Sequence, residues 1–142
     1  MLLHGLGTML FLCSMTVCGI SDYRKQIIPN LAVSAILIAS ALNILSGATF
    51  TDVVSRGIMA ACTLLLLIPW KRNLIGAGDV KMLFACATYF NIMQFTLTLI
   101  PAAALPAVFS LVSKKKIRTV AFGAWYAPVA IAMTIVTEVL TI

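Results

Sequence analysis

The sequence predicts an all-α protein that crosses a membrane several times, within one domain covering residues 1–142. Hydrophobic residues make up 62% of the chain and charged residues only 10%, whereas a soluble domain carries about 25% charged residues. Backbone polar groups inside lipid must be satisfied within a helix or a closed barrel. The long apolar runs do not alternate as barrel strands do, so we expect about six transmembrane helices, the fourth of them short.

Turn signals bound the first two helices. The first apolar run predicts a helix near residues 3–21 and ends where charged residues begin. A second helix is expected near 30–46, because the turn signals Pro29-Asn30 and Ser46-Gly47 stand on either side of it. Both segments approach the roughly 17–25 residues that a membrane-spanning helix requires.

The third and the last helices follow from two further apolar runs. Residues 52–70 predict the third helix. Asp52 is its expected N-cap, because an aspartate oxygen can accept the free N–H groups of a first turn. The last run predicts a final helix near 120–140.

The long apolar run 82–113 is open to two interpretations. As one helix it would be about 48 Å long, which exceeds a hydrocarbon core of about 30 Å. The alternative is a hairpin of two helices, near 80–90 and 93–113, that turns at Tyr89-Phe90-Asn91. We favour the hairpin because it places nearly all basic residues on one side of the membrane.

Charge then predicts the orientation in the membrane. The net charge is +6, but the basic residues lie between apolar runs, which indicates membrane orientation and not nucleic-acid binding. With six helices, nine of the ten basic residues share one side and Arg56 is the exception. The nine are Arg24, Lys25, Lys71, Arg72, Lys81, Lys114, Lys115, Lys116 and Arg118. The positive-inside rule makes that side cytoplasmic and places both termini outside.

Two aspartates meet at the cytoplasmic edge in this topology. Asp22 ends the first helix and Asp79 begins the fourth, and an ionisable residue at membrane depth indicates a functional site. Two adjacent carboxyls share a proton and titrate as a pair, which is the arrangement of aspartic proteases. We expect Gly76 and Gly78 to allow unusual dihedral angles and the close approach of an extended substrate.

Simpler interpretations of these residues stay open. Asp79 could only cap its helix, and Asp22 could form an ion pair with Arg24 or Lys25. Lys81 could hold Asp79 ionised, contact the substrate backbone or anchor the chain at the membrane interface. The two aspartates could also serve as ion sites in a transporter or in a non-enzymatic assembly component.

The cysteines predict packing and not metal binding. All four lie in apolar segments without a C-x-x-C pair, the spacing that zinc and thiol-redox sites require. We therefore expect no metal and no cofactor.

The two aspartate motifs resemble those of a known family. Asp22-x-Arg24 followed by Pro29-Asn30, together with Gly76-x-Gly78-Asp79-x-Lys81, is similar to the prepilin peptidases, membrane aspartyl proteases with a G-x-G-D motif. The resemblance implies that Asp22 and Asp79 are the catalytic pair. It also implies cleavage of the basic leader from type IV pilin precursors at the cytoplasmic face of the bacterial inner membrane.

Further expectations follow from the resemblance. The partners would be a prepilin substrate and membrane lipid, and no nucleic acid; the oligomeric state is not indicated. Larger family members carry an N-terminal extension with paired zinc-binding cysteines and also N-methylate the trimmed pilin. Here the first helix begins near Met1, so methylation is not expected. The short form resembles the peptidases dedicated to Flp-type, tight-adherence pili.

Overall fold

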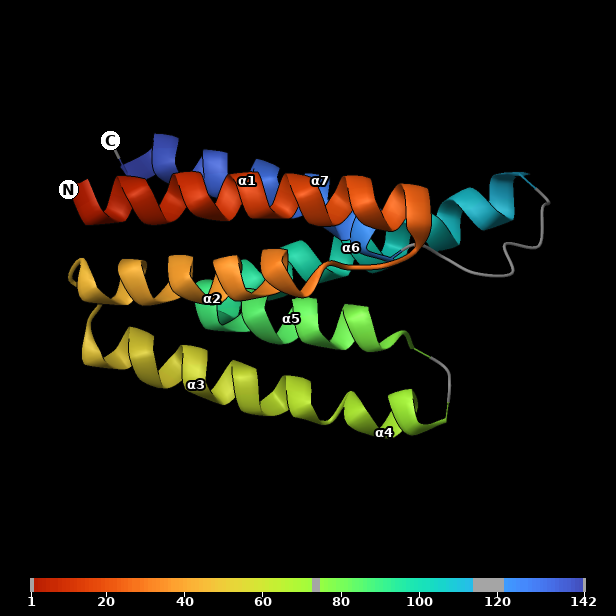
Figure 1. The fold of residues 1–142 in the computed structure, drawn as a ribbon, viewed down its shortest axis with the longest axis horizontal. Helices are drawn as coiled ribbons and strands as arrows, with labels where there is room; N and C mark the ends of the chain where they lie inside the picture. The colour runs from red at the N-terminus through yellow and green to blue at the C-terminus, as the bar shows by residue number, and fades with distance from the viewer. Residues whose placement is uncertain (1, 73–74, 114–121, 142) are drawn as a thin grey trace.

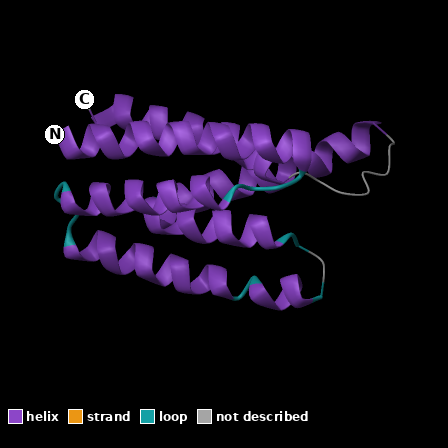
Figure 2. Ribbon diagram, viewed as in Figure 1, coloured by secondary structure: helices purple, strands orange, loops and turns teal. Residues whose placement is uncertain are grey.

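The chain folds as a bundle of α-helices. The computed structural model describes residues 2–72, 75–113 and 122–141, which contain helices and no strand (Figure 2). The helices are α1 (Leu2–Lys25), α2 (Asn30–Leu45), α3 (Phe50–Leu64), α4 (Leu67–Lys71), α5 (Ala77–Tyr89), α6 (Ile92–Ser113) and α7 (Phe122–Thr141). They lie side by side along one long axis (Figure 1). The all-α membrane-type fold expected from the sequence is therefore confirmed.

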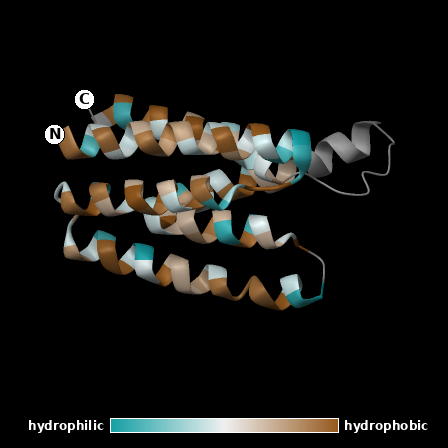
Figure 3. Ribbon diagram, in the orientation of Figure 1, coloured by the Kyte–Doolittle hydropathy of each residue, from teal (hydrophilic) through white to brown (hydrophobic). Residues whose placement is uncertain are grey.

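Several helices are long and apolar enough to cross a membrane. Among the described residues these are Leu2–Lys25, Phe50–Lys71 and Phe122–Leu140, and Asn30–Leu45 and Ile92–Leu105 are shorter apolar helices. Hydrophobic residues run along most of each of these helices (Figure 3). Large apolar side chains such as Leu31 and Phe50 are more than three-quarters exposed, as a lipid-facing surface requires.

The third expected helix is interrupted near its end, where α3 gives way to α4. Pro69 explains the break, because it has no N–H and its ring clashes with the carbonyl of Leu65, four residues earlier. The backbone tightens there, with Leu65 N–H donating to Cys62 O and Leu66 N–H donating to Thr63 O. The expected single helix over 52–70 is thus two consecutive segments.

The start of α3 also differs from the sequence-based expectation. Thr49, and not Asp52, is the N-cap: its side chain accepts the Asp52 N–H, and the Asp52 carboxylate accepts the Thr49 N–H at 3.1 Å. This reciprocal capping box satisfies two otherwise unpaired N–H groups. Asp52 is the acidic residue of the first turn, where the helix dipole favours a negative charge.

The ambiguous run 82–113 forms two helices that run in opposite directions (Figure 1). The break lies at Phe90 and Asn91, as the hairpin interpretation predicts. Asn91 and Gln94 stabilise this break through two reciprocal hydrogen bonds. The Asn91 side chain accepts the Gln94 N–H at 2.9 Å, and the Gln94 side chain accepts the Asn91 N–H at 3.2 Å. α5 has 13 residues, about 20 Å of helix, so it is the short fourth helix that the sequence predicts.

The core lies between α1, α2, α5 and α7. Phe11 of α1 stacks on Tyr89 of α5 with ring centroids 3.9 Å apart, and Phe90 packs edge-on against both rings. Two of the cysteines, Cys18 and Cys86, are fully buried in the same core. This packing places the end of α1 beside the beginning of α5.

The connections separate the two ends of the bundle. Both chain termini lie at one end, and the α1–α2 connection and the beginning of α5 lie toward the other (Figure 1). The latter end carries the described basic residues Arg24, Lys25, Lys71, Arg72 and Lys81. The basic group at 114–118 lies outside the described residues. Which end faces the cytoplasm stays a prediction.

Candidate active site

A cavity of about 350 Å³ lies at the basic end of the bundle. All five residues singled out from the sequence line it, namely Asp22, Gly76, Gly78, Asp79 and Lys81. The remaining lining residues are Gln26, Ile27, Ile28, Asn30 and Ala77. Helices α1, α2 and α5 and the α1–α2 connection therefore bring the two sequence motifs together.

Asp22 occupies the last turn of α1 and is only 5% exposed. Its Oδ2 atom accepts the backbone N–H of Ala124, at the beginning of α7, at 3.0 Å. Among the described ion pairs none involves Asp22, and Arg24 and Lys25 are both exposed. The alternative in which Asp22 pairs with either of these cations is therefore wrong.

Asp79 lies in the first turn of α5, three residues after the N-cap Gly76. Its carboxylate lies against the backbone of Gly76, since a Cβ atom on Gly76 would be 3.1 Å from Asp79 Oδ2. Asp79 therefore stands where the helix dipole and the free N–H groups of a first turn favour a negative charge. Asp22 lines the same cavity, so Asp79 also lies near a second acid.

The glycines of the motif act through space and not through unusual dihedral angles. Gly76 is extended, with φ −69° and ψ 143°, and Gly78 is an ordinary helical residue, so the expected special dihedrals are wrong. A Cβ atom on Gly76 would lie 3.1 Å from Asp79 Oδ2, and one on Gly78 would lie 3.2 Å from Ile28 Cβ. Gly76 thus permits the close approach of the Asp79 carboxylate, and Gly78 permits that of the α1–α2 connection.

Lys81 joins the two motifs. Its Nζ atom donates to the Asn30 side-chain oxygen at 3.3 Å, so α5 is linked to the beginning of α2. No ion pair between Lys81 and Asp79 occurs in the described part of the chain. The lysine is exposed at the mouth of the cavity, where it can meet a substrate as well as Asn30.

The α1–α2 connection shapes the rim of the cavity. Gln26 has a positive φ of 53°, a left-handed conformation that commonly ends a helix, and its N–H donates to Asp22 O at 2.9 Å. The hydroxyl of Ser21 donates to Ile27 O at 2.7 Å. Together these bonds turn the chain back and bury Ile28 against Gly78.

The beginning of α7 is the part of the site that sequence reasoning missed. Ala124 donates its N–H to Asp22, and Gly123 lies against the same carboxylate. The one sequence signal is a glycine in the first turn of the last helix. Tyr126, nearby, is fully buried and its hydroxyl lies 3.1 Å from Thr98 Oγ1. It belongs to the core and does not line the cavity.

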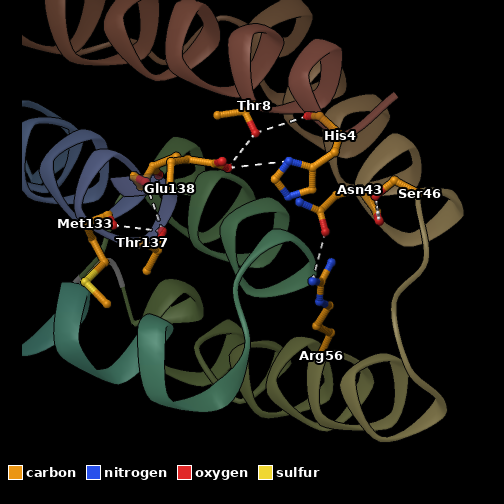
Figure 4. A network of polar contacts seen from close by, with 9 residues as sticks. His4, Thr8, Asn43, Ser46, Arg56, Met133, Thr137 and Glu138 are labelled. Carbon is orange, nitrogen blue, oxygen red and sulfur yellow. Dashed lines mark hydrogen bonds and ion pairs between the residues drawn. The ribbon is translucent and has the colours of Figure 1, made fainter. Parts of the chain in front are cut away.

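A second polar cluster lies at the opposite end (Figure 4). Thr8 of α1 donates to Glu138 of α7 at 2.9 Å, and His4 lies 3.7 Å from the same carboxylate. Arg56 of α3 donates to Asn43 of α2 at 3.0 Å. A separate cavity of about 200 Å³ is lined by His4, Asn43, Arg56 and Glu138, among others. The cluster joins the helices at the end where the termini lie.

Metal-ligand side chains do not gather in the described part of the chain, where no three His, Cys, Asp or Glu residues come together. The buried Cys86 instead contacts Met15, with the two sulfur atoms 3.7 Å apart. The cavity chemistry visible in the structure is thus that of two carboxyls, a lysine and backbone amides.

Comparison with known proteins gives one match. The model of a family described as the type IV leader peptidase family matches residues 9–111, which include Asp22 and the whole Gly76–Lys81 motif. Searches of curated proteins and of solved structures found no match.

Proposed function

The chain belongs to the type IV leader peptidase family, and from this premise we propose that it cleaves prepilin leaders with Asp22 and Asp79 as an aspartyl pair. The observation that carries the proposal is the placement of both carboxyls in one cavity. They come from different helices, α1 and α5, and no other acidic residue of the described ranges lines that cavity.

The chemistry needs one proton shared between the two carboxyls. The ionised carboxylate takes a proton from water, and the resulting hydroxide attacks the carbonyl carbon of the scissile peptide. The protonated carboxyl donates to the carbonyl oxygen as the tetrahedral intermediate forms. Collapse of that intermediate breaks the C–N bond. The proton taken from water passes to the departing amine, and a proton of the gem-diol returns to the carboxyl that protonated the carbonyl oxygen, which restores the shared proton.

The site also favours a particular substrate. A basic leader would be held at the inner membrane surface by anionic lipid, beside a cavity at the end of the bundle. We propose a Flp-type prepilin as the substrate, in the bacterial inner membrane, with the cavity on the cytoplasmic side and both termini in the periplasm. We propose peptidase activity without methyltransferase activity.

The test is cleavage of a Flp-type pilin precursor by purified wild-type protein, Asp22→Asn and Asp79→Asn. Each change keeps the side-chain size but removes the proton-transfer group, so each should lower the cleavage rate by at least about 10²–10⁴-fold. Asp52→Asn is the matched control, because Asp52 lines the opposite cavity and its variant should cleave at close to the wild-type rate. Normal processing by either active-site variant excludes the aspartyl pair and leaves the ion-site alternative, which an ion-flux assay would then detect.

A further inference from the structure

We propose that the first turn of α7 positions the aspartyl pair through a backbone N–H bond to Asp22 and through the absence of a side chain at position 123, so that Gly123 is a positioning residue of the enzyme. This inference rests on the proposed function and extends it to a segment beyond the matched residues 9–111. The N–H of Ala124 donates to Asp22 Oδ2 at 3.0 Å. The preceding residue, Gly123, lies directly against the same carboxylate.

The Ala124 N–H is available because of where it stands in the helix. α7 begins at Phe122, and the first four N–H groups of a helix have no partner within it. The positive end of the helix dipole also favours a negative charge at this position. In a membrane protein an unpaired N–H is costly, so the Ala124 N–H and the Asp22 carboxylate satisfy one another.

Close packing between α1 and α7 brings this turn to the site. A Cβ atom on Gly19 of α1 would lie only 2.8 Å from the Cβ of Ala127, so the two helices approach more closely than ordinary side chains allow. The approach lies one helical turn from Asp22 on α1 and one turn from Gly123 on α7. This close packing of α1 and α7 therefore fixes the distance between the Asp22 carboxylate and its donor on α7.

Position 123 has no room for a side chain. A Cβ atom there would lie 2.9 Å from Asp22 Oδ2, 3.2 Å from Asp22 Cγ and 3.2 Å from Ile28 Cδ1. Asp22 is buried, so its carboxylate has little space into which it can retreat. Any larger residue at 123 must push the carboxylate away from its position or displace α7.

The consequence is that α7 sets the position of Asp22, the member of the pair that comes from α1. The Ala124 N–H holds the Asp22 carboxylate, and the bare backbone at Gly123 leaves room for it. Together they fix how this carboxylate faces the cavity that it lines with Asp79.

The first variant, Gly123→Ala, tests the steric part of the proposal. We expect the protein to fold and the cleavage rate to fall by about tenfold or more, because displacing reacting groups by about 1 Å can cost 10²-fold. Gly5→Ala is the matched control, since a Cβ atom at Gly5 would meet nothing within 4 Å. Wild-type cleavage by a folded Gly123→Ala variant would overturn the steric requirement.

The second variant, Ala124→Pro, removes one donor. Proline is tolerated in a first helical turn because the missing N–H has no intrahelical partner there. We expect a lower rate and an acidic limb of the pH–rate profile that moves to higher pH, because a carboxylate without its donor is protonated more easily. Phe50→Pro, at the first residue of α3, is the control for proline insertion, and thermal unfolding monitors folding.

The outcomes separate this inference from the proposed function. If Asp22→Asn and Asp79→Asn are inactive while Gly123→Ala and Ala124→Pro cleave with the wild-type rate and pH profile, the aspartyl pair stands and the positioning role of α7 is wrong. If the asparagine variants remain active, the proposed function itself fails. A purely structural role of α7 would lower the unfolding temperature of Ala124→Pro without moving the acidic limb.

Discussion

At the scale of single residues, the environments of the two acids differ in ways that matter for the chemistry. Asp22 is buried and accepts an N–H from another helix, whereas Asp79 lies in the first turn of its own helix. The first turn of α5 is a position where a carboxylate is stabilised by free N–H groups. The Asp22 carboxylate depends instead on α7 for its donor.

At the scale of elements, the site depends on how closely the beginning of α5 meets the α1–α2 connection. Gly78 and Ile28 are in van der Waals contact across that junction, and Lys81 adds a hydrogen bond to Asn30. The left-handed Gln26 turns the connection so that Ile28 can be buried there. α5 thus presents Asp79 to α1 by packing against the connection that follows α1.

This junction predicts the effect of Gly78→Ala. The new Cβ atom would lie 3.2 Å from the Cβ of Ile28, an atom fixed to the backbone, so the connection must shift by a few tenths of an ångström. We expect a loss in cleavage rate of about tenfold, measured on the pilin precursor, without loss of folding.

The matched control for that change is Gly57→Ala on α3. A Cβ atom at Gly57 would meet nothing within 4 Å, and alanine in a helix interior is favoured over glycine by about 1 kcal/mol. This variant should cleave normally and unfold at the same or a higher temperature. Equal activity in the two alanine variants would show that the junction tolerates expansion.

At the scale of the whole molecule, the bundle has two polar ends with different compositions. One end holds the aspartate cavity and the described basic residues other than Arg56. The other holds both termini and the cluster around Glu138 (Figure 4). The apolar length between them matches a membrane protein, and the charge difference between the ends predicts that the aspartate cavity faces the cytoplasm.

Cysteine labelling in whole cells checks this orientation. In a variant without the four native cysteines, Lys25→Cys should react with a membrane-impermeant reagent only after the inner membrane is opened. Ala48→Cys, in the α2–α3 connection at the other end, should react from the periplasm. The cysteine-free protein is the background control, and the reverse labelling pattern would invert the proposed topology.

From the sequence alone, the class of fold, the helix order and both aspartate motifs could be predicted. The reason is that lipid imposes strong composition rules: apolar runs define helices, and a rare acid such as Asp22 or Asp79 is conspicuous within them. The break at Asn91 was also predictable, because a run of that length does not fit one span. Local capping was less predictable, since Thr49 and Asp52 are both suitable residues only three positions apart.

Only the tertiary structure decided how the pair is held. The role of Gly123 depends on the distance from its missing Cβ to Asp22, a residue 101 positions earlier (123 − 22). The sequence predicts unusual dihedral angles for the glycines of the motif. In the structure their missing Cβ atoms instead leave room for Asp79 and Ile28. Such contacts depend on which helices are neighbours, and composition and periodicity within one segment carry no information about the residues that another segment brings to it.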